Sequence, residues 1–232
     1  MNSFAYIYDN LDDYIKESET QKKRYELYRK VMGAENPDTL RSLNNLALTY
    51  NKLGDNIKAL ELQEKCYTQC CKVLGKEHPY TLTSLNDMAL SYSELGEHKK
   101  ALELLQKCYE IQCRVVGEEN PMTLAVLNDL ATVYNKLEDY EQTKKIIEKF
   151  YLAYCKITGA EKPTAQSILC KLIMCAFQAK DAQMVVDICK TVSNANYALI
   201  PELAERVAQI YDILQQPDKA AAVRAKEKLQ TE

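Results

Sequence analysis

Cysteine is the residue type in this chain with the widest chemical repertoire, and the sequence has nine of them. Five lie in its middle part: Cys66, Cys70, Cys71, Cys108 and Cys113. Thiolates bind zinc at about 2.3 Å, but Cys66 and Cys108 are 42 residues apart, and Cys71 and Cys113 repeat that spacing. Equivalent positions on successive helix pairs lie at least about 8–10 Å apart. We therefore predict a ladder of structural thiols and no metal site or other cofactor.

The two histidines, His78 and His98, are the candidates for acid–base chemistry. His78 precedes a proline in a loop motif, and His98 begins a charged segment, so we expect both to be solvated. Neither has a cysteine or serine partner at a repeating distance, and no glycine-rich phosphate loop is present. We expect no catalytic residues, and therefore no enzyme.

A period of 42 residues organises the sequence. The loop motif Gly33-Ala34-Glu35-Asn36-Pro37 returns three times, and its prolines are Pro37, Pro79, Pro121 and Pro163. Leucine, alanine and tyrosine follow each of the first three prolines at helical spacing, as in Leu46-Ala47-x-x-Tyr50. Proline suits the first turn of a helix, and Asn36 or Asn120 before it can cap the free amides. These prolines therefore predict helix starts.

A second helix follows each of these helices. Gly54 and Gly96 can adopt the left-handed conformation that closes a helix, and an acidic residue follows each of them. Small residues such as Ala47 and Ala59 recur where two helices must approach closely. Each repeat is thus predicted to be a helical hairpin, and stacked hairpins form a superhelix. The predicted fold is all-α, a right-handed α-solenoid of antiparallel hairpins with about twelve helices.

We expect a single repeat domain over residues 1–232. Its predicted parts are a partial first hairpin at 1–32, regular repeats at 33–74, 75–116 and 117–158, a degenerate repeat at 159–196, and a short capping hairpin at 197–232. The partial hairpin rests on matching Phe4-Ala5-x-x-Tyr8 with Leu46-Ala47-x-x-Tyr50. A chain that opens inside a hairpin suggests a piece of a longer protein.

Charge and composition exclude several classes of protein. The formal net charge is -3, from 33 acidic and 30 basic residues without long blocks of one sign, which argues against a nucleic-acid-binding surface. The sequence lacks a signal peptide and an apolar run of membrane-spanning length. An odd number of cysteines and the lack of a CxxC motif fit a reducing compartment. We predict a cytoplasmic protein that binds neither membranes nor nucleic acids.

The Leu-x-x-Leu-Ala-x-x-Tyr core and the glycine turn resemble the tetratricopeptide repeat. The 42-residue length, the Leu43-Asn44-Asn45-Leu46-Ala47 block and the G-x-E-[NH]-P loop resemble the kinesin light chain type. The resemblance is strong over residues 33–158 and weak elsewhere. Two positions depart from the pattern, Glu138 where glycine is expected and Gln63 where an apolar residue is usual.

The resemblance implies that the first helices of the hairpins line a concave groove, where polar side chains hold an extended peptide. An amide side chain both donates and accepts, so it can bind a peptide backbone of any sequence. The peptide-binding candidates implied by register are Arg41, Asn44, Asn45, Asn86, Asp87, Asn128, Asp129 and Asn135. The alternative for these asparagines and aspartates, above all for Asn44, Asn86 and Asn128, is that they only link neighbouring hairpins by hydrogen bonds.

The candidates also carry charge. Asp87 and Asp129 would repel a carboxylate that only Arg41 attracts, so we expect a polar, partly basic or mixed-charge peptide. The leading hypothesis is an adaptor that binds a partner protein in its groove. A regulatory or sensor segment of a larger multidomain enzyme is the alternative, and a self-associating structural solenoid is a third possibility.

Overall fold

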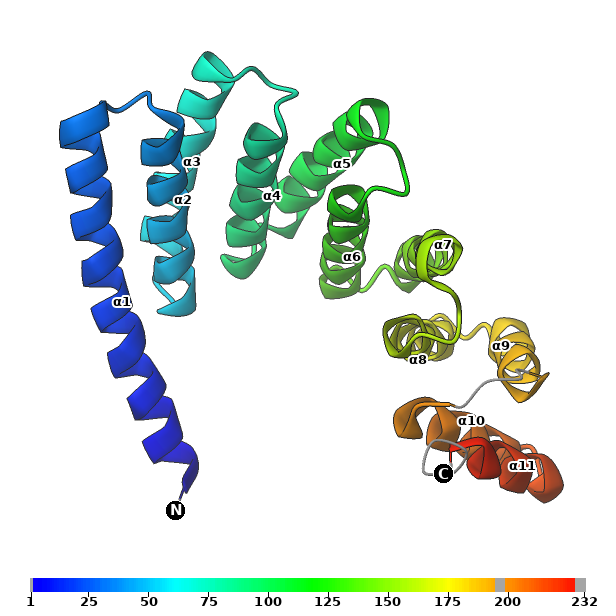
Figure 1. The fold of residues 1–232 in the computed structure, drawn as a ribbon. Helices are drawn as coiled ribbons and strands as arrows, with labels where there is room; N and C mark the ends of the chain where they lie inside the picture. The colour runs from blue at the N-terminus through cyan, green and yellow to red at the C-terminus, as the bar shows by residue number, and fades with distance from the viewer. Residues whose placement is uncertain (1, 195–198, 228–232) are drawn as a thin grey trace. The chain divides into compact units, whose positions relative to one another are not determined.

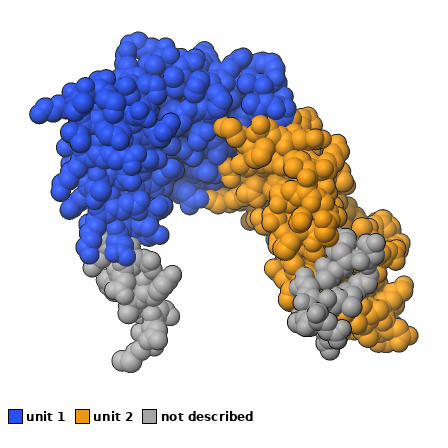
Figure 2. All heavy atoms as spheres, viewed as in Figure 1, with its two compact units in different colours: residues 1–117 blue, residues 118–232 orange. Residues whose placement is uncertain are grey.

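The computed structural model describes residues 2–194 and 199–227, with side chains described over 13–194 and 199–225. Every regular element in these ranges is an α-helix, which confirms the all-α class. The chain forms two compact units, Met1–Gly117 and Glu118–Glu232 (Figure 2). The expected division into repeats of one domain stays a prediction, and its last segment, 197–232, lies partly outside the described residues.

Unit 1 is a stack of antiparallel helices in which each helix packs on the next (Figure 1). Its helices are α1 (Asn2–Met32), α2 (Pro37–Lys52), α3 (Asn56–Val73), α4 (Pro79–Glu94) and α5 (His98–Val115). The helices α2 and α4 also touch each other directly, as the first helices of successive hairpins do in a solenoid.

Unit 2 continues the same alternation. Its helices are α6 (Pro121–Lys136), α7 (Tyr140–Thr158), α8 (Pro163–Gln178), α9 (Ala182–Asn194), α10 (Pro201–Ile213) and α11 (Pro217–Glu227). Here α8 packs on α10 and α9 packs on α11, so the last two hairpins lie against each other through both of their helices. The predicted solenoid class is confirmed.

The predicted helix starts are confirmed at the prolines that follow each loop. The side chains of Asn36 and Asn120 accept hydrogen bonds from the amides of Asp38 and Met122, both at 2.9 Å. His78 occupies the same position, and its Nδ1 accepts from the amide of Tyr80 at 3.1 Å. A histidine considered for catalysis is therefore a helix cap.

The first 32 residues differ from the expected partial hairpin, because residues 2–32 form the single helix α1. Register places Asp12 where Gly54 ends a helix, and residues 2–32 contain no glycine or proline. Glycine and proline are the residues that most often end a helix, and without either of them here the helix continues. The side chains of Phe4 and Tyr8, which suggested the hairpin, lie outside the described residues.

The turns inside the hairpins have a left-handed residue at one fixed place. Gly54 and Gly96 have φ of 80° and 84° there, as predicted. Glu138, Lys180 and Gln215 hold the equivalent place in the later hairpins with φ of 59°, 58° and 56°. Side chains other than glycine are strained in this region, so the fold imposes this conformation whatever residue occupies the turn.

Exposed ion pairs repeat with the period of the fold. Lys72 and Glu35 are 2.5 Å apart, Arg114 pairs with Glu77, and Lys156 and Glu119 are 3.4 Å apart. In each pair a cation near the end of a second helix meets the glutamate of the loop 37 residues earlier. The glutamate of the G-x-E-[NH]-P motif therefore ties its loop to the following hairpin.

Candidate functional site

The eight predicted peptide-binding residues lie on first helices in both units. Arg41, Asn44 and Asn45 are on α2, Asn86 and Asp87 are on α4, and Asn128, Asp129 and Asn135 are on α6. In unit 1 the structure brings Asn44 and Asp87 together, since Asn44 Nδ2 donates to Asp87 Oδ2 at 2.6 Å. Asn44 is only 3% exposed. It therefore links α2 to α4, as the alternative interpretation of the sequence allowed.

A second polar link runs parallel to the first. Asn51 and Ser91 exchange hydrogen bonds of 2.8 and 3.1 Å between α2 and α4. Arg41, by contrast, keeps 62% of its side chain exposed, 3.7 Å from Asp38. Asn45 is partly exposed, and its side chain has no hydrogen-bond partner among the described residues. Arg41 and Asn45 are thus the members of the unit 1 set best placed to meet a ligand.

The remaining candidates differ in exposure. Asn86, Asp87, Asn128 and Asp129 are partly buried, whereas Asn135 is exposed. A partly buried side chain on the face of a helix can combine a structural bond with a contact to a ligand. Asn128 makes a structural bond of this kind, because its Oδ1 accepts a hydrogen bond from Lys171 Nζ at 3.3 Å. This bond connects α6 to α8.

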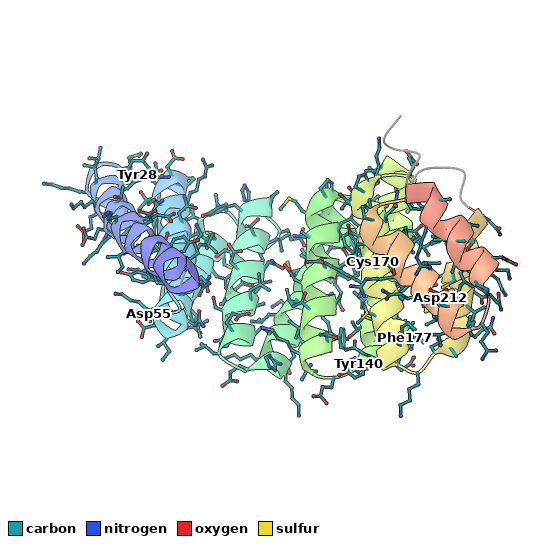
Figure 3. The ribbon with its side chains drawn as sticks, turned by 90° about the horizontal axis from the view of Figure 1, so that it is seen from below. Tyr28, Asp55, Tyr140, Cys170, Phe177 and Asp212 are labelled. Atoms are coloured by element: carbon teal, nitrogen blue, oxygen red, sulfur yellow. The ribbon has the colours of Figure 1, made fainter. Side chains whose placement is uncertain are left out.

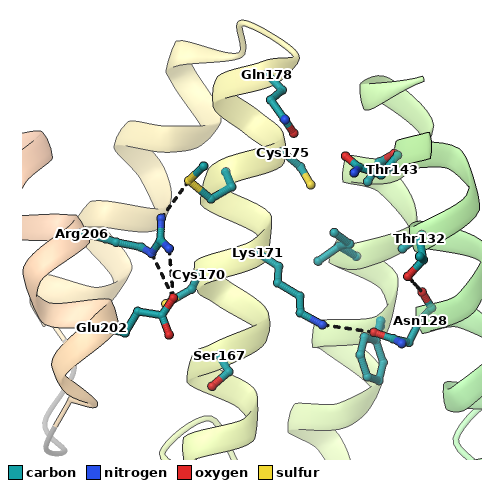
Figure 4. Close-up of a pocket in the computed structure, with 15 residues that line it drawn as sticks. Asn128, Thr132, Thr143, Ser167, Cys170, Lys171, Cys175, Gln178, Glu202 and Arg206 are labelled. Atoms are coloured by element: carbon teal, nitrogen blue, oxygen red, sulfur yellow. Dashed lines mark hydrogen bonds and ion pairs between the residues drawn. The ribbon is translucent and has the colours of Figure 1, made fainter. Parts of the chain in front are cut away.

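Unit 2 contains a cavity of about 440 Å³ built around α8, with α6, α7 and α10 as its walls (Figure 4). Two predicted residues, Asn128 and Asn135, line it. The other lining residues are Ala131, Thr132, Thr143, Ile147, Phe150, Ser167, Cys170, Lys171, Met174, Cys175, Gln178, Glu202 and Arg206. We call this the α8 cavity, and it is within the ~300–1,000 Å³ range of ligand pockets.

The charged groups of the α8 cavity are two cations and one carboxylate. Arg206 holds Glu202 through Nε at 3.3 Å and Nη2 at 3.0 Å, and its Nη1 lies 2.8 Å from Met174 Sδ (Figure 4). Lys171 lies on the opposite side and points towards Asn128. The cavity therefore carries an excess positive charge, with amide and hydroxyl groups between the cations.

The sequence prediction missed Lys171 and Arg206. Lys171 stands 42 residues after Asp129, and Arg206 has the same place relative to Ala208 and Tyr211 as Asn45 has to Ala47 and Tyr50. Carrying the register into the degenerate repeats would have found both. That position changes along the chain from amide to acid to base: Asn45, Asp87, Asp129, Lys171 and Arg206.

Comparison with known families agrees with this geometry. The tetratricopeptide repeat family matches residues 5–70 and 38–114. The chain is a tetratricopeptide repeat protein. Its 42-residue repeats are of the kinesin light chain type, as the sequence motifs predicted.

Solved structures extend the likeness over most of the chain. A protein from Podosopora anserina with nearly identical kinesin light chain TPR-like repeats is 25% identical, with a TM-score of 0.68, over 84% of this chain and 98% of the other. A point variant of it is 24% identical over 92% and 93%, also at 0.68. BtubC from P. vanneervenii is 16% identical with a TM-score of 0.69, over 94% and 89%. No curated protein matches the sequence significantly.

Two buried cysteines of this repeat protein bond inside their own hairpins. Cys66 Sγ donates to the carbonyl oxygen of Leu40 and Cys108 Sγ to that of Leu82, both at 3.4 Å and both 26 residues apart. Burial raises the pKa of Cys170, which lines the α8 cavity, to about 11. A thiol with that pKa is protonated near neutral pH and is a poor nucleophile.

Two other features bear on chemistry. His98 Nδ1 lies 3.4 Å from Ser93 Oγ at the start of α5. Within the described residues, no group of three or more histidine, cysteine, aspartate or glutamate side chains could hold a metal ion. None of the described helices has both the length and the apolar character needed to cross a membrane.

Proposed function

We propose that this tetratricopeptide repeat protein is an adaptor that binds an extended segment of a partner protein along the exposed face of α8. The repeat fold is that of a protein–protein interaction scaffold. The observation that carries the finer proposal is the α8 cavity, which combines a ligand-sized volume with amide, hydroxyl and cationic side chains. An apolar floor that includes Ile147 and Phe150 gives the segment a surface to bury.

The chemistry of the cavity favours a mixed-charge segment. Asn135 is exposed and can hold a peptide backbone through both its donor and its acceptor. Lys171 and Arg206 attract carboxylates, whereas Asp87 and Asp129, at the equivalent position in earlier repeats, repel them. A partner segment with an acidic part over α8, and a neutral or basic part over the helices that carry Asp87 and Asp129, would match the charges of both sets of residues.

Unit 1 contributes less in this proposal than the sequence suggested. Arg41 and Asn45 remain candidates for contact with the partner, since both are accessible. Asn44 serves mainly to join α2 to α4. The roles of Asn86, Asp87, Asn128 and Asp129 in binding follow from register with Asn45 and Asn44, and stay part of the proposal.

The test is a binding measurement on defined peptides. Peptides selected by display on the purified chain are labelled with a fluorophore and titrated by anisotropy against the natural chain and a Lys171→Ala, Asn135→Ala variant. We expect at least tenfold weaker binding, which is about 1.4 kcal/mol. Lys190→Ala, outside the cavity, is the matched control. Equal affinity for all three proteins would refute the cavity as the binding site.

We also infer that the protein is not an enzyme and works in the cytoplasm. The raised pKa of Cys170 and the capping role of His78 support the first inference. The second is supported by the nine cysteines, all of which lie in the described ranges as free thiols. Detection of disulfides in freshly purified protein by mass spectrometry under non-reducing conditions would count against a reducing compartment.

A further inference from the structure

The turns of the last two hairpins expose large apolar side chains. Phe177, near the end of α8, is 49% exposed, and Ile213, the last residue of α10, is 76% exposed. Figure 3 shows Phe177 on α8 beyond Cys170, towards the turn. Both residues replace polar ones. Register aligns Phe177 with Asn51, Ser93 and Asn135, and aligns Ile213 with Lys52, Glu94, Lys136 and Gln178.

The two replacements meet at one cavity. Phe177, Ile213 and Leu214 line a space of about 350 Å³ between the α8–α9 turn and α10. Val185 and Ile210 are buried below it, and Ala176 completes the apolar wall. We call this the turn-end pocket. Since two independent departures from a polar pattern converge on the same pocket, its apolar character is not a by-product of the repeat.

The rim of the turn-end pocket carries one available cation. Asp181 lines the pocket, but its carboxylate is held by Lys144 Nζ at 2.6 Å. Lys180, next to it, is exposed and has no ion pair within the described part of the chain. It also occupies the left-handed turn position with φ of 58°, where Gly54 and Gly96 stand in the regular hairpins.

We propose that the turn-end pocket binds a short segment of a partner protein, which inserts one bulky apolar side chain and places a neighbouring carboxylate on Lys180. The volume suits a single aromatic or large aliphatic side chain, and the free cation selects the negative charge. A second copy of this chain fits less well. An apolar patch of this kind is at most a few hundred Å², whereas a stable interface needs about 800 Å² from each partner. This proposal is independent of binding in the α8 cavity.

Nuclear magnetic resonance on the full ¹⁵N-labelled chain tests the proposal. The probes are three blocked ten-residue glycine–serine peptides that carry a central Phe-Asp, Ala-Asp or Phe-Lys pair. The Phe-Asp peptide should shift the amides of residues 176–186 and 210–214 and bind at least tenfold more tightly than the other two. No shifts there, or equal binding of the three peptides, overturns the proposal. Concentration-dependent shifts of the same amides without peptide would also overturn it, by identifying a second copy as the occupant.

Two variants make the test specific, and neither is expected to unfold the chain. Ile213→Lys restores the residue type of Lys52 and Lys136, and Lys180→Gly restores that of Gly54. Both should weaken Phe-Asp binding at least threefold with an unchanged helical circular dichroism spectrum. Val115→Lys, at a residue 41% exposed in unit 1, is the matched control and should bind normally. Lys171→Ala should also bind normally, because it affects only the α8 cavity. Unaltered affinity in both pocket variants would overturn the assignment.

Discussion

Units 1 and 2 stack similar hairpins by different means. In unit 1, polar side chains join neighbouring helices, as in the Asn44–Asp87 and Asn51–Ser91 pairs. Unit 2 instead has a continuous cluster of apolar side chains that extends from α6 to α11, with Ile173, Leu203 and Val207 among its most buried members. The polar seam thus continues as far as the Asn128–Lys171 bond between α6 and α8, and apolar packing replaces it between α8 and α10.

The α8 cavity follows from this difference. Cys170 stands where Asn44 stands in unit 1, and it is 3% exposed. A thiol cannot make the strong link that an amide makes to a carboxylate. Arg206 has the place of Asp87 in the next hairpin, so it bonds to Glu202 and Met174 instead of an amide and lines the cavity. Lys171 also lines the cavity but keeps a link of the unit 1 kind, because it donates to Asn128. The loss of the repeat pattern in unit 2 is what gives it a candidate site.

The substitution with the largest expected effect disrupts the apolar core of unit 2. Leu203 is fully buried on α10 within the apolar cluster. Leu203→Ala should lower the free energy of unfolding by about 2–5 kcal/mol, because transfer free energy is lost and a cavity is left. Urea denaturation followed by circular dichroism measures it. A loss below about 1 kcal/mol would show that the cluster contributes little to stability.

The next effect has the opposite sign and lies in unit 1. Gln63 has no exposed surface, and neither side-chain amide atom has a hydrogen-bond partner among the described residues. Leu105 and Ile147 hold the equivalent place in later repeats. Gln63→Leu should therefore stabilise the chain by about 1–3 kcal/mol, since it removes an unsatisfied buried amide. A lower urea midpoint for Gln63→Leu than for the natural chain would contradict this expectation.

A smaller effect sharpens the role of the polar seam. Asn44→Ala should cost about 1–2 kcal/mol, because it removes the hydrogen bond to Asp87 that joins α2 to α4. A double-mutant cycle with Asp87→Ala isolates the coupling between the two, which we expect to be about 1 kcal/mol. Additive effects of the two substitutions would mean that the link contributes nothing beyond its separate side chains.

The turns give a smaller difference still. Lys180→Gly removes a side chain from a left-handed residue and should raise stability by up to about 1 kcal/mol. Gly54→Ala, at φ of 80°, should lower stability by a similar amount, about 1 kcal/mol. Thermal unfolding of the two variants and of the natural chain measures both changes in stability. Effects of the same sign in the two variants would show that strain does not govern these turns.

The smallest effect depends on pH. The Lys144 ammonium that bonds to Asp181 lowers the pKa of that carboxyl. Because the pKa is lower in the folded chain than in the unfolded one, the pair stabilises fully above about pH 4. The stabilisation by this ion pair is lost as the pH falls through the pKa of Asp181 in the folded chain. Stability measured from about pH 5 to pH 3 should therefore fall less steeply in Asp181→Asn than in the natural chain. Identical slopes would refute the assignment.

Sequence reasoning predicted the parts of the fold that local residues determine. Prolines, capping asparagines and turn glycines predicted the starts and turns of the regular hairpins, because each acts on the backbone within one or two residues of itself. It failed at α1, where register suggested a turn although neither glycine nor proline is present there. A periodic pattern indicates which positions are equivalent, but it does not show that the chain turns at each of them.

The candidate site was predicted less completely. Register found Asn128 and Asn135, which line the α8 cavity. It could not decide whether Asn44 binds a ligand or a neighbouring helix, because both uses need the same amide on the same face. Lys171 and Arg206 were missed because they contribute charge where earlier repeats carry amides and acids. The turn-end pocket depends on the packing of two hairpins, which no single repeat encodes.

The loop-to-hairpin ion pairs have a consequence for how the chain folds. Each joins residues 37 positions apart, and the other side-chain links between neighbouring hairpins span 18 to 43 positions. None of these links needs a residue from a distant part of the chain before it can form. During synthesis, each hairpin can dock as soon as the next has left the ribosome, which favours rapid folding at low contact order. Whole repeats could then be gained or lost in evolution, because the junction on each side is made of the same pair.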